Sequence, residues 1–440
     1  MFAPASETLE PTLGTILTPD VTTLPSGLRV ASVTMPHLHS VAFGVSVAAG
    51  AVNEPANLNG LAHLLEHMAF KGTERRSARA IAEEVEAVGA DINAFTGRMM
   101  TSYHMRALSE HLPMGLDVIS DLLCNSVFDA SELERERGVV LQEIGAAEDT
   151  PDDVVFDLLQ ETAYPGQSLG RPILGRADCL GRVGRDHLKG FMADLYDAPH
   201  MIVTAAGDVD HARLVDLAGE HLDKLPKVRA GQAPEPPHYG GGEARAPREL
   251  EQAHLTFAFK APAAMTDGYY ETWILSEILG GGMSSRLFQD IREERGLVYS
   301  IYSSYRAYPT AGLFLIYAGT AGGDAQEVAS RSAAALHDLG NHVTEAEIAR
   351  AKAQVKAAVL MGLESPTNVA DALATDFLHY GRWVTPEEVI GRIEAITAND
   401  VQGAVRALLT APMTFASVGP TGALETYDAL AAMFGTPKNS

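Results

Sequence analysis

A stretch near the middle of this 440-residue chain is predicted to lie outside any packed core, and it divides the sequence in two. Residues 229–249 are rich in proline, glycine and charge and poor in apolar side chains, which is typical of a linker. Because single hydrophobic cores rarely grow beyond about 250 to 300 residues, we expect two compact units. We place them at residues 1–230 and 249–440, joined by a linker at 231–248.

The sequences on the two sides of this linker resemble each other. Strand-like runs at residues 41–47 and 254–259 each precede a helical pattern. Further along, the Glu-Leu-x-Arg of residues 132–135 matches the Glu-Ile-x-Arg of residues 347–350 at an offset of 215 (347 − 132). The repeat predicts two homologous α/β domains that arose by internal duplication.

The first half contains two histidines four residues apart, His63 and His67, with Glu66 directly before the second. In an α-helix the two imidazoles share one face, and the carboxylate points toward the same place. Neutral imidazoles bind Zn²⁺ well, and a glutamate can take the proton of a zinc-bound water that attacks a carbonyl. Because the chain has 15 histidines, a chance pair of ordinary histidines is the alternative. A catalytic zinc also needs a third protein ligand from elsewhere.

A candidate third ligand follows in a charged helical run. Glu136 and Glu143 are seven residues apart, so they share a helical face. Glu143 follows the apolar residues 139–141, where a buried carboxylate is costly unless it is paired or bound to metal. Glu136 could instead be a plain surface charge. At the offset of 215, the two glutamates fall on Ala351 and Ala358, so we expect a metal site in the first half alone.

Several motifs in this order resemble those of the pitrilysin-type zinc peptidases, in particular the branch of mitochondrial and bacterial processing peptidases. The resemblance extends from about residue 24 to about residue 420. It implies an α+β fold of two α/β domains, each a mostly antiparallel sheet with helices packed on it. The matching segments are residues 63–73, 93–96, 136 with 143, 154–157, 169–175 and 279–288.

The resemblance assigns a role to each residue of the first-half motif. It implies that His63, His67 and Glu143 hold one Zn²⁺ per chain and that Glu66 is the general base. Glu136 would orient a ligand or the water molecule.

The resemblance also implies a strand that pairs with an extended peptide substrate. This strand comprises Asn93, Ala94, Phe95 and Thr96. Such pairing reads the peptide backbone more than its side chains, which suits a peptidase of loose sequence preference. The alternative is an ordinary strand end after a helix that stops at Gly89.

In the second half, Arg292 precedes Gly296 and Tyr299 follows it. By spacing alone, a helix stop with a solvated arginine and a packed tyrosine is the simpler interpretation. In the family, an arginine and a tyrosine seven residues apart hold the substrate carbonyl and stabilise the oxyanion, and we assign that role here. Family members enclose a chamber with four such domains. Since this chain has two, we expect a homodimer in which each chain completes the other's active site.

Composition limits the partners. The formal charge of −24 argues against nucleic acid and anionic membranes, and it favours basic peptides as substrates. Residues 1–10 lack the basic and apolar segments of a signal peptide, and no run of 18 apolar residues could span a membrane. With two cysteines in no metal or disulfide pattern, we expect a cytoplasmic protein.

The predicted function is therefore a zinc endopeptidase that cleaves peptides or unfolded presequence-like segments. Two alternatives stay open. A non-catalytic relative could act as a scaffold, although such relatives lose motif residues that this chain keeps. A metal-dependent hydrolase of another class would need the zinc residues but none of the later motifs.

Overall fold

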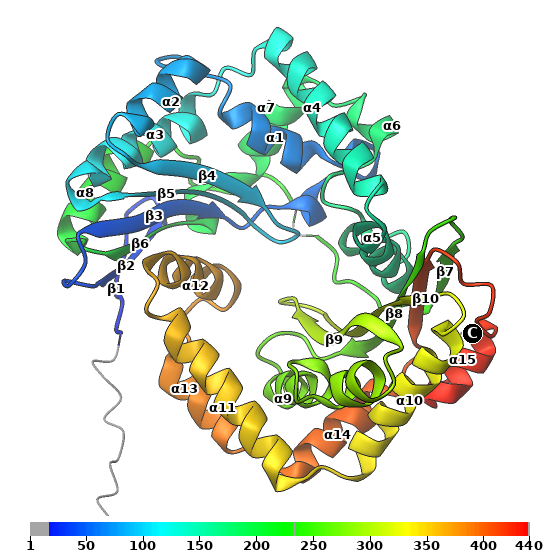
Figure 1. Cartoon of the computed structure of the whole chain (residues 1–440). Helices are drawn as coiled ribbons and strands as arrows, with labels where there is room; N and C mark the ends of the chain where they lie inside the picture. The colour runs from blue at the N-terminus through cyan, green and yellow to red at the C-terminus, as the bar shows by residue number, and fades with distance from the viewer. Residues whose placement is uncertain (1–16, 233, 439–440) are drawn as a thin grey trace, which may run out of the picture.

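Each half of the chain is built around one sheet, and five strands follow the same order in both sheets, with one additional edge strand in the first (Figure 1). The computed structural model describes residues 17–232 and 234–438. The first sheet has the order β1-β2-β6-β3-β5-β4, with the bounds Asp20–Thr23, Arg29–Thr34, Met201–Gly207, Ser40–Val47, Thr101–Leu108 and Asp91–Thr96. The second has the order β7-β11-β8-β10-β9, with the bounds Gly242–Ala246, Thr414–Val418, Gln252–Ala261, Gly312–Ala321 and Val298–Ala307. Only the β2–β6 and β7–β11 pairs among these strands are parallel, so the predicted fold class is confirmed.

The helices follow the strands in a similar order in both halves. The first half contains α1 (Leu61–Ala69), α2 (Ala78–Glu86), α3 (Leu112–Asn125), α4 (Ala130–Glu148), α5 (Pro151–Ala163), α6 (Ala177–Leu180), α7 (Arg185–Leu195) and α8 (His211–Leu222). The second contains α9 (Tyr269–Gly280), the π-helical segment η6 (Phe288–Glu294), α10 (Ala325–Asn341), α11 (Glu345–Gly362), α12 (Pro366–His379), α13 (Pro386–Glu394), α14 (Ala398–Leu408) and α15 (Tyr427–Phe434). Helices α4 and α11 begin 215 residues apart, as do α5 and α12 (345 − 130 and 366 − 151), which confirms the predicted repeat.

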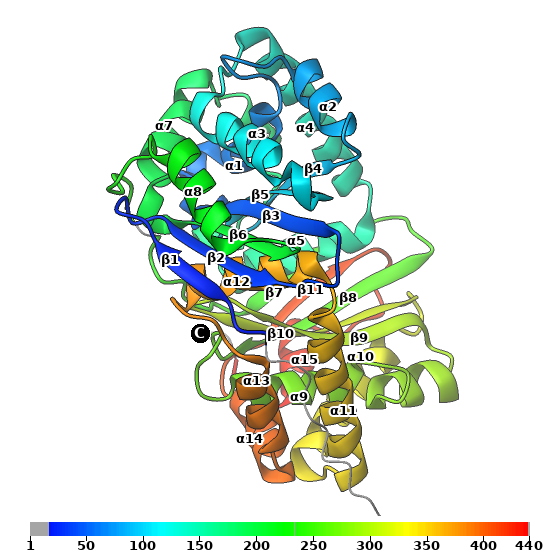
Figure 2. The same ribbon diagram turned by 90° about the vertical axis from the view of Figure 1, so that its left-hand side faces the viewer.

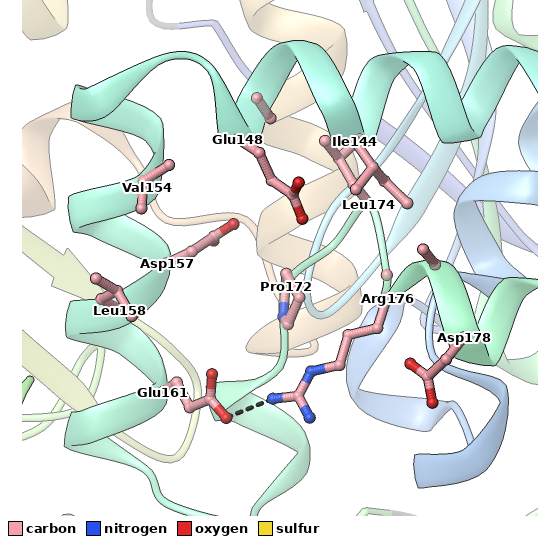
Figure 3. Close-up of a pocket in the computed structure, with 13 residues that line it drawn as sticks. Ile144, Glu148, Val154, Asp157, Leu158, Glu161, Pro172, Leu174, Arg176 and Asp178 are labelled. Atoms are coloured by element: carbon pink, nitrogen blue, oxygen red, sulfur yellow. Dashed lines mark hydrogen bonds and ion pairs between the residues drawn. The ribbon is translucent and has the colours of Figure 1, made fainter. Parts of the chain in front are cut away.

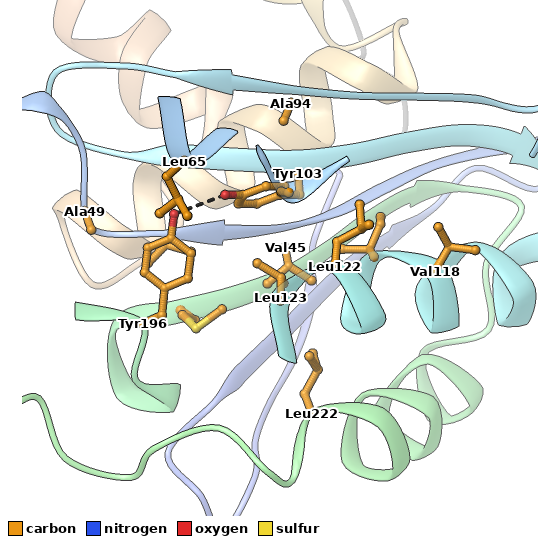
Figure 4. Packing of buried hydrophobic residues seen from close by; sticks show 14 of the residues in the cluster. Val45, Ala49, Leu65, Ala94, Tyr103, Val118, Leu122, Leu123, Tyr196 and Leu222 are labelled. Carbon is orange, nitrogen blue, oxygen red and sulfur yellow. Dashed lines mark hydrogen bonds between the residues drawn. The ribbon is translucent and has the colours of Figure 1, made fainter. Parts of the chain in front are cut away.

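One face of each sheet packs on helices of its own half. In the first half, α1 directs Leu64, Leu65 and Met68, all 0% exposed, into the core against the sheet. Figure 4 shows this core, in which the hydroxyl groups of Tyr103 and Tyr196 are hydrogen-bonded at 3.2 Å. Because the apolar face of α1 is fixed inward, His63 and His67 are directed toward α4, where both contact Glu143.

The other face of each sheet is covered by a helix from the opposite half (Figure 2). Helix α12 packs Val369 and Leu373 against β2 and β6 of the first sheet. Helix α5 packs Val155 and Leu159 against β8, β10 and β11 of the second sheet. Since α5 and α12 are equivalent in the repeat, the exchange is reciprocal, and each half buries apolar surface of the other.

The structure differs from the predicted linker at residues 242–246. These residues form β7, which pairs in parallel with β11 at the edge of the second sheet. The segment lacks large apolar side chains and is half-exposed, so the alternating pattern that predicts strands is absent. The division into residues 1–230 and 249–440 otherwise stays a prediction.

Two further expectations concern membranes and targeting. Within residues 17–232 and 234–438, none of the helices combines the length and apolar character that crossing a bilayer requires. The prediction made for residues 1–10 lies outside the described residues.

Candidate metal centre

The helix that carries the two histidines is held at its start by a buried carboxylate. Helix α1 begins after Gly60, whose φ of 98° is left-handed, and a Cβ there would lie 2.9 Å from the carbonyl oxygen of Leu174. Glu54 supplies the missing cap, since its Oε2 accepts the N–H of Gly60 at 2.9 Å and its Oε1 accepts that of Ala62 at 2.8 Å. A carboxylate at this position complements the helix dipole. Glu54 therefore fixes the start of α1 directly before His63.

The other candidate ligand lies on α4. This helix is capped by Asp129 and presents one buried face, made of Leu133, Glu136, Val140 and Ile144. Glu143 lies beside that face, and its side chain is 40% exposed. The expected burial of Glu143 behind residues 139–141 is wrong, because Val139 and Leu141 are 39% and 38% exposed and only Val140 faces the core.

Helices α1 and α4 bring three candidate ligands together. One ligand atom each of His63, His67 and Glu143 lies within 4.8 Å of the others. Oε2 of Glu143 is 3.7 Å from Nε2 of His63 and 3.6 Å from Nε2 of His67. In the described part of the chain, no other group of three or more histidine, cysteine, aspartate or glutamate side chains is placed to hold a metal ion.

The chemistry of these donors fits zinc. Two imidazoles and one carboxylate form a common ligand set for a catalytic zinc ion. Burial lowers the pKa of His63 to about 4, and the neighbouring His67 adds to the shift. Since an imidazole must be neutral to bind a metal, His63 is held in its ligand form.

Glu136 contacts His67 from the side opposite Glu143. Its carboxylate is 8% exposed, with Oε2 3.1 Å from Nδ1 of His67 and Oε1 2.8 Å from Nζ of Lys71. A hydrogen bond to Nδ1 leaves Nε2 as the free ligand atom of the imidazole. The burial excludes the alternative of a plain surface charge. Lys71 had no role in the sequence analysis, although its spacing of four residues after His67 was a usable signal.

Glu66 lies next to an edge strand. Burial raises the pKa of Glu66, and hydrogen bonds with Thr96 oppose this shift. Oε2 of Glu66 is buried without a hydrogen-bond partner in the described part of the chain. Thr96 ends β4, the edge strand that also carries Asn93, Ala94 and Phe95, with Phe95 42% exposed. The carboxylate therefore faces the end of an unpaired strand edge.

Arg292 and Tyr299 lie together in the second half. The guanidinium carbon of Arg292 is 5.9 Å from the centre of the Tyr299 ring and 4.7 Å from that of Phe288. The Tyr299 side chain is 76% exposed. Among the described residues, no hydrogen bond or ion pair connects this pair to the cluster on α1 and α4. The exposure excludes the alternative of a packed tyrosine.

An acidic cavity lies beside α4, the helix that carries Glu143. It lies between α4, α5 and residues 172–178, and Ile144, next to Glu143 in sequence, is part of its wall (Figure 3). Its only arginine within the described chain, Arg176, is hydrogen-bonded to Glu161. Further carboxylates in the wall are those of Glu148, Asp157 and Asp178. The cavity therefore carries an excess of negative charge.

Comparison with known proteins agrees with this geometry. Residues 29–177 match the family model described as insulinase (peptidase family M16), and residues 182–355 match that of the peptidase M16 inactive domain. The chain is 35% identical to the uncharacterized zinc protease YmxG of Bacillus subtilis over 401 residues, which cover 91% of this chain and 98% of the relative. It is also 35% identical to an uncharacterized zinc protease of Mycobacterium tuberculosis over 431 residues, covering 95% and 97% of the two chains.

Two solved structures share the fold. A crystal structure named as a peptidase M16 inactive domain from Pseudomonas fluorescens superposes with a TM-score of 0.85 at 23% identity, covering 93% of this chain and 99% of that one. A protease from Helicobacter pylori superposes with a TM-score of 0.86 at 22% identity, covering 92% and 100%. With zinc proteases matched along nearly its whole length and a fitting ligand set on α1 and α4, the chain belongs to peptidase family M16 and is a zinc metalloprotease.

Proposed function

We propose that this chain is a zinc endopeptidase that cleaves peptides or unfolded presequence-like segments inside a closed chamber. The observation that carries the proposal is the convergence of His63, His67 and Glu143, whose ligand atoms lie within 4.8 Å of one another. These three side chains would hold one zinc ion per chain. Bound zinc polarises the scissile carbonyl and lowers the pKa of a water molecule.

Glu66 is the proposed general base. It takes the proton of the attacking water and passes it to the leaving amine. Its placement supports this role, because its helix position is adjacent to both histidines and its Oε2 has no partner in the described part of the chain. Glu136 and Lys71 position His67 from behind, through contacts of 3.1 Å and 2.8 Å at the two carboxylate oxygens of Glu136.

The substrate backbone pairs with the free edge of β4. Asn93, Ala94, Phe95 and Thr96 would then lie along the cleaved segment, as in other cases of strand addition. Support comes from the edge position of β4 and from the proximity of Thr96 to Glu66, which affects the pKa of that carboxyl group. A peptide added to this edge therefore passes the base.

The second half acts on the substrate of a partner chain. Arg292 and Tyr299 supply donors to the carbonyl oxygen on which negative charge develops. Their distance of 5.9 Å from each other and the 76% exposure of Tyr299 support a joint contact with a bound molecule. In the proposed homodimer, each chain presents this pair to the other's zinc site, and the four domains enclose the chamber.

Basic peptides in the cytoplasm are the proposed substrates. The formal charge of −24 and the acidic cavity beside α4 both favour cationic segments. The two alternatives, a scaffold protein and a hydrolase of another class, have no specific observation in their favour.

The base is tested by Glu66→Gln. We expect the rate at which the protein cleaves a peptide mixture to fall by about 10²- to 10⁴-fold while zinc stays bound. Mass spectrometry of the peptides measures this rate. The exposed Glu86→Gln on α2 is the matched control and should cleave normally. Normal cleavage by Glu66→Gln would contradict the assigned mechanism.

The dimer is tested by complementation. Glu66→Gln and Arg292→Ala should each be inactive as homodimers. After co-expression, a mixed dimer has one zinc site with an intact base facing an intact Arg292, so about a quarter of the wild-type activity should return. An inactive mixture, with exchange verified by mass spectrometry, would show that the two halves act within one chain.

A further inference from the structure

A second cavity lies in the half of the chain that has no metal ligands. It measures about 450 Å³ and is lined by α9, the end of α11, α12 and the residues leading into α13. Its wall contains five aromatic side chains, those of Tyr269, Tyr270, Trp273, Tyr380 and Trp383. It also contains the carboxylates of Asp371 and Asp376.

This cavity is the duplicated counterpart of the acidic cavity in Figure 3. Six wall positions of the first cavity recur in the second at the offset of 215 (359 − 144): Ile144 and Val359, Ala147 and Gly362, Glu148 and Leu363, Asp157 and Ala372, Leu174 and Val389, Glu161 and Asp376. Of these pairs, only the last keeps a carboxylate in the second half. The duplication thus kept the hollow and replaced most of its charge with aromatic surface from α9 and residues 380–383.

The charges in this wall are negative and available. In the described part of the chain, no lysine or arginine lines the cavity. The nearby Arg382 is engaged by Glu388 through two hydrogen bonds of 2.7 Å. Asp376 uses Oδ2 to accept the N–H of Val384 at 2.9 Å, and Asp371 has no hydrogen bond or ion pair among the described residues. Burial raises the pKa of Asp376 to about 6, so its carboxylate is still ionised at neutral pH.

Aromatic side chains beside carboxylates that make no ion pair with a lysine or arginine in the described part of the chain select for an organic cation. The ring faces attract a cation through their quadrupoles, and a planar guanidinium can stack on them while it pairs with a carboxylate. An anion would be repelled by Asp371 and Asp376. A neutral apolar group would remove water from both carboxylates without replacing their hydrogen bonds.

We propose that this cavity binds an arginine side chain of a peptide substrate, at a site remote in the fold from the metal ligands. The guanidinium lies among the aromatic rings and pairs with Asp371 and Asp376. That the arginine belongs to a substrate rests on the proposed endopeptidase function, whereas the binding itself does not require cleavage.

Both tryptophans of the chain, Trp273 and Trp383, line this cavity, so intrinsic tryptophan fluorescence reports on it directly. We expect N-acetyl-arginine amide to change the fluorescence of the wild-type protein in a saturable way. N-acetyl-citrulline amide, which has nearly the same shape without the charge, should bind at least about tenfold more weakly. Equal affinity for the two, or no saturable change, would overturn the proposal.

Variants locate the binding. The double variant Asp371→Asn with Asp376→Asn should weaken binding of the arginine probe by about tenfold, and the exposed Asp216→Asn on α8 should not change it. Agmatine, which carries the guanidinium without peptide groups, distinguishes an arginine in a peptide from a free amine as the ligand. If agmatine binds tenfold more tightly than the blocked arginine, the cavity serves free amines and the peptide proposal fails.

A cleavage assay keeps this inference distinct from the proposed function. With an arginine-containing peptide, the double variant should raise KM about tenfold and leave kcat unchanged. If the arginine probe fails to bind while the wild-type protein cleaves and Glu66→Gln does not, the inference falls and the function stands. If the probe binds but no peptide is cleaved, the function falls and only the assignment to a substrate is lost.

Discussion

The two halves share an order of five strands and a similar succession of helices, yet among the described residues only the first contains a group of side chains placed to hold a metal ion. Helix α1 carries His63, Glu66 and His67, whereas α9, which also begins after a left-handed glycine, carries no histidine. On α11, the positions equivalent to Glu136 and Glu143 are alanines. The candidate metal centre therefore differs from the equivalent region of the second half at few side chains, and the fold does not depend on these side chains.

What the second half kept is as informative as what it lost. It provides α12 to cover the first sheet and receives α5 in return. It also kept a cavity at the equivalent position of α11 and α12. The half without metal ligands therefore has a structural role in stabilising the half that carries them.

The largest effect is expected when the first half is made to resemble the second. Glu143→Ala copies the residue found at position 358 and removes one metal ligand. Activity should fall by at least about 10³-fold with loss of zinc, because two histidines alone bind the ion weakly. Stability of the metal-free protein should change by less than about 1 kcal/mol, since Glu143 is 40% exposed. Zinc content, cleavage rate and urea unfolding measure the three results; full activity would contradict the ligand assignment.

The packing of α12 on the first sheet and of α5 on the second is tested by Leu373→Ala on α12 and Leu159→Ala on α5. Both leucines are 0% exposed, so each truncation should cost about 2–5 kcal/mol. Hydrogen exchange should become faster in the sheet of the opposite half in each case. The control Met361→Ala, at a residue that is 64% exposed, should have little effect. Faster exchange confined to the half that carries the substitution would contradict the exchange of helices.

A smaller effect is expected from Lys71→Met. Lys71 is the cation that pairs with the buried Glu136, at 2.8 Å, and through it steadies His67. Zinc affinity should fall by about 10- to 100-fold, as is usual when a partner of a metal ligand is lost. Competition with a chelator of known affinity measures this change. Lys71→Arg should recover part of the loss, and an unchanged affinity for Lys71→Met would exclude a positioning role.

The smallest expected effect concerns Glu54, whose hydrogen bonds to the start of α1 have no counterpart at the start of α9 among the described residues. Burial raises the pKa of Glu54 from 4.5 to about 7, so the folded state holds this proton more tightly than the unfolded state does. Stabilisation from protonation is complete below the unfolded pKa and is lost as the pH rises through about 7. The stability margin of the wild type over Glu54→Gln should therefore be larger at pH 5 than at pH 8, as measured by urea unfolding. A margin that grows with pH would contradict the assignment.

Much of the site was predictable because helical spacing fixes which side chains share a face. The spacing of four between His63 and His67 and of seven between Glu136 and Glu143 places each pair on one side of its helix. The repeat at offset 215 predicted which half lacks the metal ligands. These predictions depend on local geometry alone.

The remainder depends on tertiary packing. The apolar faces of α5 and α12 fit either sheet, so no local pattern reveals that the helices are exchanged. Glu54 contacts α1 through backbone N–H groups, which leave no trace in the sequence. Strand β7 has too few large apolar side chains to be recognised, and it forms because β11 offers a free edge.

The most direct test of the central claim is the zinc content of the purified protein. We expect one zinc ion per chain in the wild type, measured by mass spectrometry of the metal, and none in the double variant His63→Ala with His67→Ala. Zinc that remains bound at one ion per chain in the double variant, or a second tightly bound ion in the wild type, would contradict a single metal centre confined to the first half.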